Sequence, residues 1–411
     1  MTKATADRQR LAAPLLALAC AWATFLPIGG KYLGYVGCGL AALVALQRAG
    51  ALKQLGREPG FQAAAAFFSF TMLSALWSAG SLRDIAGQLG LYSLLLLVPV
   101  IAAGCPPAFA RRALRYFALT SAVVGTAIAL DRHGLLPGGL VWHSTVEAEG
   151  NQRIVTSLVL ALGAAIALVE ALRSTEDVRQ RWTWVTVAML AVLGLALQDR
   201  RTGMVALPVL LAVLGLAHQR RRHLGRAVAL LALVAGLSIA AWQWAPGVRG
   251  RINEGVQEML VYRSTDTAAT SWGMRLRLAE HTLDMARAAP IAGNGVGSWL
   301  VEWRRRVQPG LLISIHTTPH NEYLLVLSQL GAVGIVLLGW LLLGHLRRAW
   351  RAGDAGLAAL VAWTAITWTG LFNVVLRDAK FALPLLLVAG LAGAVQRGVQ
   401  REVEGSARNS G

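Results

Sequence analysis

The sequence predicts an all-α integral membrane protein with about 12 transmembrane helices and one long helical loop between two of them. Of its 411 residues, 55% are apolar and only 15% are charged, and the mean hydropathy is +0.53. A soluble domain carries about 25% charged residues. Stretches such as 11–27 and 154–171 are apolar on every side, as helices in a bilayer must be. A single water-soluble domain and a disordered chain are therefore both excluded.

The apolar stretches place the individual spans, because about 20 apolar residues are needed to cross the hydrocarbon core. We expect spans at 11–28, 32–47, 61–79, 85–104, 113–130, 154–172, 182–198, 203–218, 226–245, 321–345, 355–376 and 379–396. Only a tight turn containing Arg377, Asp378 and Lys380 separates the last two. The first stretch lacks a small-x-small cleavage site, so we expect no cleavable signal. Residues 1–411 are expected to form a single membrane domain.

The basic residues predict the orientation of the chain, because short cytoplasmic loops are enriched in Lys and Arg. If the N-terminus is cytoplasmic, the inside segments hold 22 of the 39 basic residues and the short outside segments hold eight. The remaining nine lie in 246–319, a segment too long for the rule to apply. The tails 1–10 and 397–411 are therefore expected in the cytoplasm, and 131–153 and 246–319 outside.

The net charge of +18 does not indicate a nucleic-acid partner, because the charges lie in short clusters between apolar spans. Membrane lipids are the expected surroundings of these clusters. The three cysteines, Cys20, Cys38 and Cys105, show no spacing typical of a disulfide framework or a zinc site.

The segment 246–319 is expected to contain amphipathic helices. Two apolar stripes have helical spacing: Ile252, Val256, Met259 and Leu260 form the first, and Trp299, Leu300, Trp303 and Val307 form the second. The second helix also carries Arg304, Arg305 and Arg306. Tryptophan beside arginine is typical of a helix that lies on a membrane surface.

Common enzyme signatures are missing: the sequence has no phosphate-binding P-loop, no CxxC pair and no G-x-S-x-G elbow. The run from Gly293 to Gly297 follows no strand and indicates a tight turn after Pro290. His316 and His320 have the spacing of two metal ligands on one helix face. Pro319 interrupts such a helix, so we expect neither a metal site nor a cofactor.

His320 lies at the point where an apolar span begins, directly after Pro319 and before Asn321. The dipole at a helix N-terminus disfavours a charged imidazolium. A neutral imidazole there is suited to act as a general base, although a structural histidine fits the same pattern.

Four arginines on the outside form the second unusual feature: Arg200, Arg201, Arg275 and Arg277. A charge close to the hydrocarbon is costly unless it faces a cavity or an anion, or extends to lipid phosphates. Arg binds phosphate through a bidentate fork. Together with one histidine, these residues predict a site for an anionic lipid.

Three motifs follow one another on the outside of the predicted membrane domain. Arg201-Thr202-Gly203 opens the eighth span, and a second motif runs from Arg275 to the turn Pro290-x-x-Gly293-x-Gly295. The third, Pro319-His320-Asn321-Glu322-Tyr323-Leu324, enters a span after a long outside loop. Together these motifs resemble the superfamily of O-antigen ligases and O-antigen polymerases. Two departures are visible. Ala279 stands where an aromatic residue often follows the loop arginine. In addition, two arginines are available for each arginine position of the family: Arg200 or Arg201, and Arg275 or Arg277. Their sequence distances to the neighbouring motifs favour Arg201 and Arg275 as the matching residues.

The resemblance implies a membrane glycosyltransferase of the GT-C-like type in the bacterial inner membrane, with a periplasmic active site. A ligase transfers O-antigen polysaccharide from undecaprenyl pyrophosphate to a sugar hydroxyl of lipid A–core, which implies both lipids as partners. His320 is then the catalytic base of a metal-independent inverting transfer, and Arg201 and Arg275, or Arg200 and Arg277, bind the donor pyrophosphate. Asn321 and Glu322 have orienting roles, with Glu322 as the competing base.

Several alternatives remain open. An O-antigen polymerase and a protein O-oligosaccharyltransferase use the same lipid-linked donor. A secondary transporter or lipid flippase would also have 12 spans, but it should show related halves or ionisable residues near the bilayer midplane, and the sequence shows neither. A receptor or scaffold without catalysis is the remaining class.

Overall fold

The computed structural model describes residues 3–136, 151–174, 176–198, 201–219, 271–307 and 316–409, with single residues between 250 and 260. Every element in these ranges is helical, and they contain no strand. The α-helices are α1 (Lys3–Ala23), α2 (Ile28–Arg48), α3 (Leu52–Leu55), α4 (Pro59–Leu73), α5 (Leu82–Ser93), α6 (Leu97–Gly104), α7 (Pro107–Arg132), α9 (Asn151–Arg173), α10 (Val178–Leu197), α11 (Arg201–Gln219), α14 (Ser271–Ala288), α15 (Trp299–Arg306), α16 (Glu322–Arg351), α17 (Leu357–Thr369) and α18 (Ala379–Asn409). Short 3-10 turns η1 (Ser74–Trp77), η2 (Leu94–Leu96) and η5 (Gly353–Gly356) join some of them.

The all-α membrane fold is confirmed. Nine helices in the described ranges are long and apolar enough to cross a membrane, and α1 contains a shorter apolar part, Ala13–Ala23. Each predicted span overlaps a helix except 226–245, which lies outside the described residues. The predicted stripe from Ile252 to Leu260 also falls outside them, apart from the single residue Leu260.

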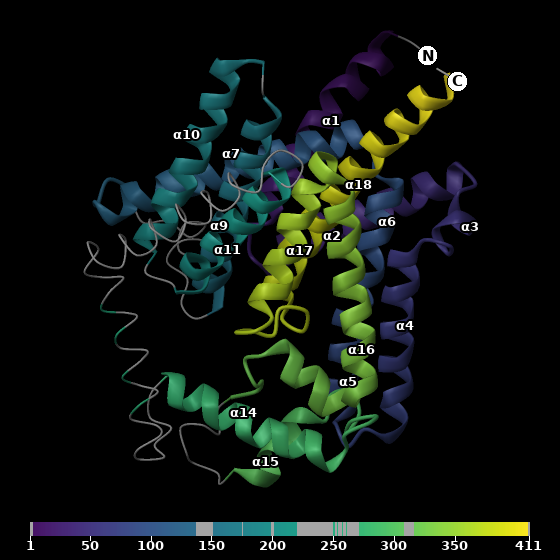
Figure 1. Cartoon of the computed structure of the whole chain (residues 1–411), viewed down its shortest axis with the longest axis vertical. Coiled ribbons are helices and arrows are strands. Elements are labelled where there is room, and N and C mark those ends of the chain that lie inside the picture. The colour runs from purple at the N-terminus through teal and green to yellow at the C-terminus, as the bar shows by residue number, and fades with distance from the viewer. Residues whose placement is uncertain are drawn as a thin grey trace.

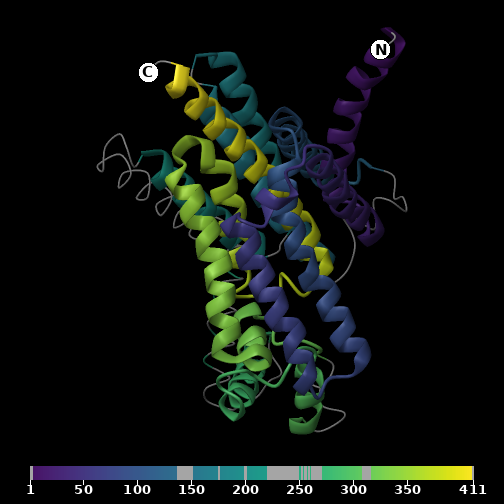
Figure 2. The same ribbon diagram turned by 90° about the vertical axis from the view of Figure 1, so that its right-hand side faces the viewer.

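The helices run between two distinct ends of the molecule. Figure 1 shows that α1 starts and α18 finishes at one end, which we call the terminal end, while α14 and α15 lie at the opposite loop end. Figure 2 shows the same arrangement from the side, with α4 and α16 descending together to the loop end. The orientation rule applied to the sequence predicts that the terminal end is cytoplasmic and the loop end external.

Small residues allow the helices to pack closely, as in other membrane bundles. At the crossing of α7 and α10, a Cβ atom added to Gly194 would lie 2.2 Å from the Cα atom of Gly125. Gly203, in the motif that opens α11, packs in the same way: its added Cβ would lie 2.4 Å from the carbonyl oxygen of Ser157 on α9. Gly203 therefore has a role in helix packing that is separate from any role in the reaction.

The predicted span 355–376 is wrong in its second half. Helix α17 covers only 13 residues, Leu357–Thr369, which at 1.5 Å per residue is about 20 Å and shorter than the hydrocarbon core. Residues 370–378 form turns instead of a helix. Non-helical backbone is tolerated at membrane depth only when protein surrounds it, and Val375 and Leu376 are indeed buried.

The predicted membrane-surface helix forms, as α15, but its tryptophans do not face lipid. Trp299 and Trp303 are buried and stacked, with ring centroids 5.3 Å apart. Trp299 donates a hydrogen bond to Thr282 on α14 (3.0 Å), and Trp303 packs edge-on against His281, also on α14. The apolar stripe is therefore used for packing within the loop end, because α14 offers it a complementary face.

A break in α16 holds the loop end to the bundle. Gly331 has φ 64° and ψ −160°, which interrupts the helix and deprives nearby backbone groups of their helical partners. The turn at 290–295 replaces those partners through four bonds: Asn294 N to Ser328 O (3.1 Å), Gly295 N to Gln329 O (2.8 Å), Ala332 N to Pro290 O (2.8 Å) and Val333 N to Ile291 O (3.2 Å). The glycine run is thus a tight turn that fills a gap in a membrane helix.

Candidate functional site

His320 lies at the loop end, immediately before α16, in a backbone conformation that L-residues rarely adopt. Its φ is +52°, the single positive value for a non-glycine residue among those described. Such a conformation costs about 1 kcal/mol or more and persists only where the surroundings impose it. Asn321 caps α16 by accepting a hydrogen bond from the backbone N–H of Leu324 (2.9 Å), so the helix begins directly after the strained residue.

The non-helical segment 370–377 holds the residues before and after His320 and so helps to fix this conformation. Three hydrogen bonds connect it to the residues around His320: Glu322 N to Gly370 O (2.8 Å), Asn321 Nδ2 to Leu371 O (2.9 Å) and Arg377 Nη1 to Thr317 O (3.2 Å). Because α17 ends at Thr369, residues 370–377 are not helical and can bond to the residues around His320.

His320 and His316 form a pair. The Nε2 atom of His320 lies 3.2 Å from Nδ1 of His316, and the two rings are nearly perpendicular, at 78°. The segment that joins them is non-helical, as Pro319 predicts. From the sequence, the spacing of the two histidines suggests only metal ligation for His316, and its contact with His320 is visible only in the structure. Within the described residues, no group of three His, Cys, Asp or Glu side chains could hold a metal ion.

The contact between the two rings needs one imidazole to donate and the other to accept, and the direction depends on their tautomers. Nε2 of His316 also contacts the thioether sulfur of Met274 on α14. In the tautomer in which Nε2 of His320 carries the hydrogen, Nδ1 of His320 keeps a lone pair that can take a proton from a substrate.

Both imidazoles are held in the neutral form. The pKa of His320 is lowered to about 4, first by burial and then by the charges of Arg275 and His316. The pKa of His316 is lowered by burial and by Arg275. Burial and the nearby charge of Arg275 both disfavour the charged ring, so the pKa of His320 lies below the usual value of a histidine.

The two candidate arginines of α14 differ in their surroundings. Arg275 acts electrostatically on both imidazoles, whereas Arg277 pairs with Glu280 at 3.7 Å on the same helix. Arg201 begins α11 as predicted, but its side chain lies outside the described part of the structure, as does the whole of Arg200. The charge of Arg275, and not that of Arg277, thus acts on the histidine pair.

The carboxylate of Glu322 bonds to the backbone of the 370–377 segment and to Tyr92, and not to either imidazole. It is 2% exposed, and its Oε2 atom accepts from the backbone N–H of Leu376 at 2.8 Å. Its Oε1 atom accepts from the hydroxyl of Tyr92 at 3.1 Å, and Gln88 donates in turn to Tyr92 at 3.3 Å. These contacts support an orienting role for Glu322. Tyr92 was not anticipated, because it lies 230 positions away and belongs to no motif.

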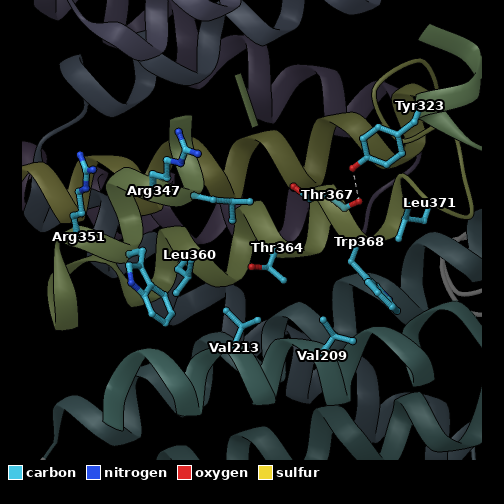
Figure 3. Close-up of a pocket in the computed structure, with 12 residues that line it drawn as sticks. Val209, Val213, Tyr323, Arg347, Arg351, Leu360, Thr364, Thr367, Trp368 and Leu371 are labelled. Carbon is cyan, nitrogen blue, oxygen red and sulfur yellow. Dashed lines mark hydrogen bonds between the residues drawn. The ribbon is translucent and has the colours of Figure 1, made fainter. Parts of the chain in front are cut away.

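An apolar groove of about 710 Å³ starts next to the site and runs between α11, α16 and α17. Figure 3 shows Tyr323 and Leu371 near one end of it and Arg347 and Arg351 at the other. Tyr323 follows His320 by three residues and is fixed by a hydrogen bond from its hydroxyl to Thr367 O (2.7 Å). The groove thus extends from the loop end along the membrane-spanning part of α16 towards the terminal end.

Residues 184–339 of the chain match the family model described as O-antigen ligase. The matched region contains Arg201, Arg275, His316 and His320. A comparison with curated proteins found no match. The resemblance to the O-antigen ligase family is therefore confirmed, and it supports a function of the O-antigen ligase or polymerase type, as a glycosyltransferase-like enzyme of lipopolysaccharide synthesis.

Proposed function

From the match to the O-antigen ligase family, we propose that the protein is an O-antigen ligase that transfers polysaccharide from undecaprenyl pyrophosphate to a sugar hydroxyl of lipid A–core. The reaction takes place at the loop end, on the periplasmic face of the inner membrane. The observation that carries this proposal is the neutral pair of His320 and His316 beside Arg275, because it joins a base to a cation suited to phosphate.

The proposed step is a single displacement. Nδ1 of His320 removes the proton of the acceptor hydroxyl, whose oxygen forms a bond to the anomeric carbon of the donor sugar. The bond from that carbon to the pyrophosphate oxygen breaks, and undecaprenyl pyrophosphate leaves with the electron pair. Attack from the opposite face inverts the anomeric carbon. Arg275 and Arg201 stabilise the negative charge that develops on the leaving group.

The low pKa of His320 couples its basicity to donor binding. An imidazole with a pKa of about 4 is a weak base. The negative pyrophosphate beside Arg275 offsets the positive charge that helps to lower this pKa. His320 therefore gains basicity when the donor is bound, and His316 accepts the Nε2–H hydrogen bond of the imidazolium that forms.

The groove beside Tyr323 accommodates the polyprenyl chain of the donor. Its surface is almost entirely apolar, and its loop end is lined by Tyr323, three residues after His320. A lipid-linked donor needs its pyrophosphate at the membrane surface and its chain within the hydrocarbon. The groove between α11, α16 and α17 supplies an apolar surface for the chain.

Lipopolysaccharide banding in a ligase-deficient Gram-negative host with matching core and O-antigen tests the proposal. We expect the wild-type protein to restore the high-mass ladder and His320→Ala to fail at equal membrane abundance. Arg277→Ala, a change in an arginine that pairs locally, is the matched control and should keep the ladder. Restoration by His320→Ala would exclude the base assignment. If the wild-type protein acts only in a polymerase-deficient host, the polymerase function is correct instead.

A further inference from the structure

A second polar cavity lies at the terminal end, on the far side of the bundle from His320. It has a volume of about 120 Å³ and is enclosed by α4, α6, α16, α17 and α18. Its polar lining includes Glu58, His345, Arg348 and Arg397. A water molecule needs only about 10–15 Å³ of such space, so the cavity has room for a larger polar group. The site proposed above uses none of these residues.

His345 presents an unpaired donor to this cavity. Its ring stacks on Trp363 with centroids 4.0 Å apart, and its Nδ1 atom lies 3.2 Å from Nη2 of Arg348. A guanidinium only donates, so Nδ1 must be the acceptor and Nε2 must carry the hydrogen. Among the described residues, Nε2 is buried and has no hydrogen-bond partner. A buried donor of this kind points to an acceptor that is not part of the protein.

The ionisable side chains that line the cavity carry a net positive charge. Arg397 and Glu58 pair through both guanidinium nitrogens and both carboxylate oxygens, at 3.1 and 3.0 Å. Their charges cancel, and the charge of Arg348 remains. A charge this close to the hydrocarbon is costly without an anion.

The N-terminus of α4 adds to this positive potential. Helix α4 has 15 residues and begins at Pro59, so the partial positive charge of its dipole faces the cavity. A Cβ atom at Gly60 would lie 2.7 Å from Nη2 of Arg348 and 2.9 Å from Cε1 of His345. Glycine at this position therefore lets both donor side chains reach over the helix N-terminus.

We infer that this cavity binds one phosphate group at the terminal end, which the orientation rule predicts to be cytoplasmic. The ligand must be a hydrogen-bond acceptor with negative charge, because Nε2–H of His345 is a surplus donor and the guanidinium of Arg348 and the dipole of α4 add positive potential. Such a group is supplied either by the headgroup of an anionic phospholipid or by free phosphate. In either form it ties α4 to α16 at the face opposite the transfer site.

Thermal unfolding of the purified full-length protein in detergent tests this inference. Inorganic phosphate is titrated against chloride at constant ionic strength, and in a second arm a short-chain phosphatidic acid is titrated against phosphatidylcholine. Both titrations use the Arg275→Gln variant as background, so that the site near His320 does not contribute. A saturable rise in Tm with phosphate assigns free phosphate as the ligand, and a saturable rise with phosphatidic acid alone assigns a lipid headgroup.

Substitutions then locate the binding. Arg348→Gln should weaken the response about tenfold or more, since it removes a charge-assisted hydrogen bond. His345→Phe preserves the stacking on Trp363 and should also weaken it, which keeps the test informative if Arg348→Gln folds poorly. Arg401→Gln, a change in an exposed arginine of α18 that lines neither this cavity nor the groove, is the matched control. If neither ligand stabilises the background protein, or if both cavity variants respond like the control, the inference is wrong.

Discussion

The Nε2 atom of His320 lies 3.2 Å from Nδ1 of His316, across a segment that Pro319 keeps out of a helix. The proposed transfer uses the tautomer in which Nε2 of His320 donates to Nδ1 of His316, so that Nδ1 of His320 can accept a proton. We therefore propose a positioning role for His316, which its position in the sequence alone does not show.

His316→Leu is expected to reduce kcat about tenfold or more, because His320 loses the partner that selects its tautomer. His316→Gln supplies a carbonyl oxygen as acceptor and should recover part of the activity. Turnover of a lipid-linked donor by purified protein measures both variants. If Leu and Gln at this position reduce kcat equally while the Tm is unchanged, the proposed hydrogen-bond role is excluded.

The pH profile should show an acid limb near the pKa of His320. This pKa is lowered to about 4, so the imidazole is neutral above that pH and kcat/KM should fall only as the pH approaches 4. Arg275→Gln removes one of the causes of the lowering, so the limb should move upward while the maximal rate drops about 100-fold or more.

Arg277→Gln is the control for this experiment, because the residue lies on the same helix and pairs with Glu280. It should change the maximal rate less than about threefold and leave the limb in place. An acid limb near 6.5 in the wild-type free enzyme would contradict the assigned environment of His320.

Glu322→Gln distinguishes an orienting residue from a base. The carboxylate accepts from Leu376 N and Tyr92 Oη, and an amide can replace only one of these acceptors. We expect a loss of stability of about 1–3 kcal/mol, with partial activity, and a smaller loss of about 1 kcal/mol for Tyr92→Phe. Differential scanning fluorimetry and the transfer assay measure the two effects. Abolished activity at an unchanged Tm would instead identify Glu322 as the base.

Gly295→Ala should be among the most damaging single changes at the loop end. Its φ is +87°, and an added Cβ would lie 2.4 Å from the Cα atom of Ser78. We expect a destabilisation of about 3 kcal/mol or more, through backbone strain and displacement of the turn from the α16 break. Gly90→Ala on α5 meets no atom within 4 Å and is the control, with a change within about 1 kcal/mol of zero or slightly stabilising. Equal Tm values for the two variants would contradict this packing.

Thr364→Trp tests the groove, because the larger side chain fills the space between α11 and α17. We expect the KM for a polyprenyl-linked donor to rise about tenfold, with little change for a donor that has a short prenyl chain. Leu343→Trp, on the exposed surface of α16, serves as the control. An equal effect on long and short donors would show that the groove does not hold the chain.

Apolar length, charge distribution and short motifs are enough to predict the membrane fold, most of the spans and the motif around His320. Apolar runs and capping residues act locally, and each apolar helix is stable in the bilayer by itself. These features can therefore be predicted without knowing the contacts between helices. The same local patterns placed Asn321 at a helix start and the glycines from Gly293 to Gly297 in a turn. The likeness to the O-antigen ligase family could likewise be recognised from short ordered motifs.

Which of these residues contact one another is visible only in the folded chain. The stop of α17 at Thr369, the bond from Leu376 N to Glu322, and Tyr92 as its second donor depend on contacts between distant segments. The same is true of the choice of Arg275 over Arg277 and of the burial that lowers the pKa of His320. Backbone groups that leave a helix within a membrane must find partners elsewhere in the protein. Those partners are supplied by packing, which no local pattern encodes.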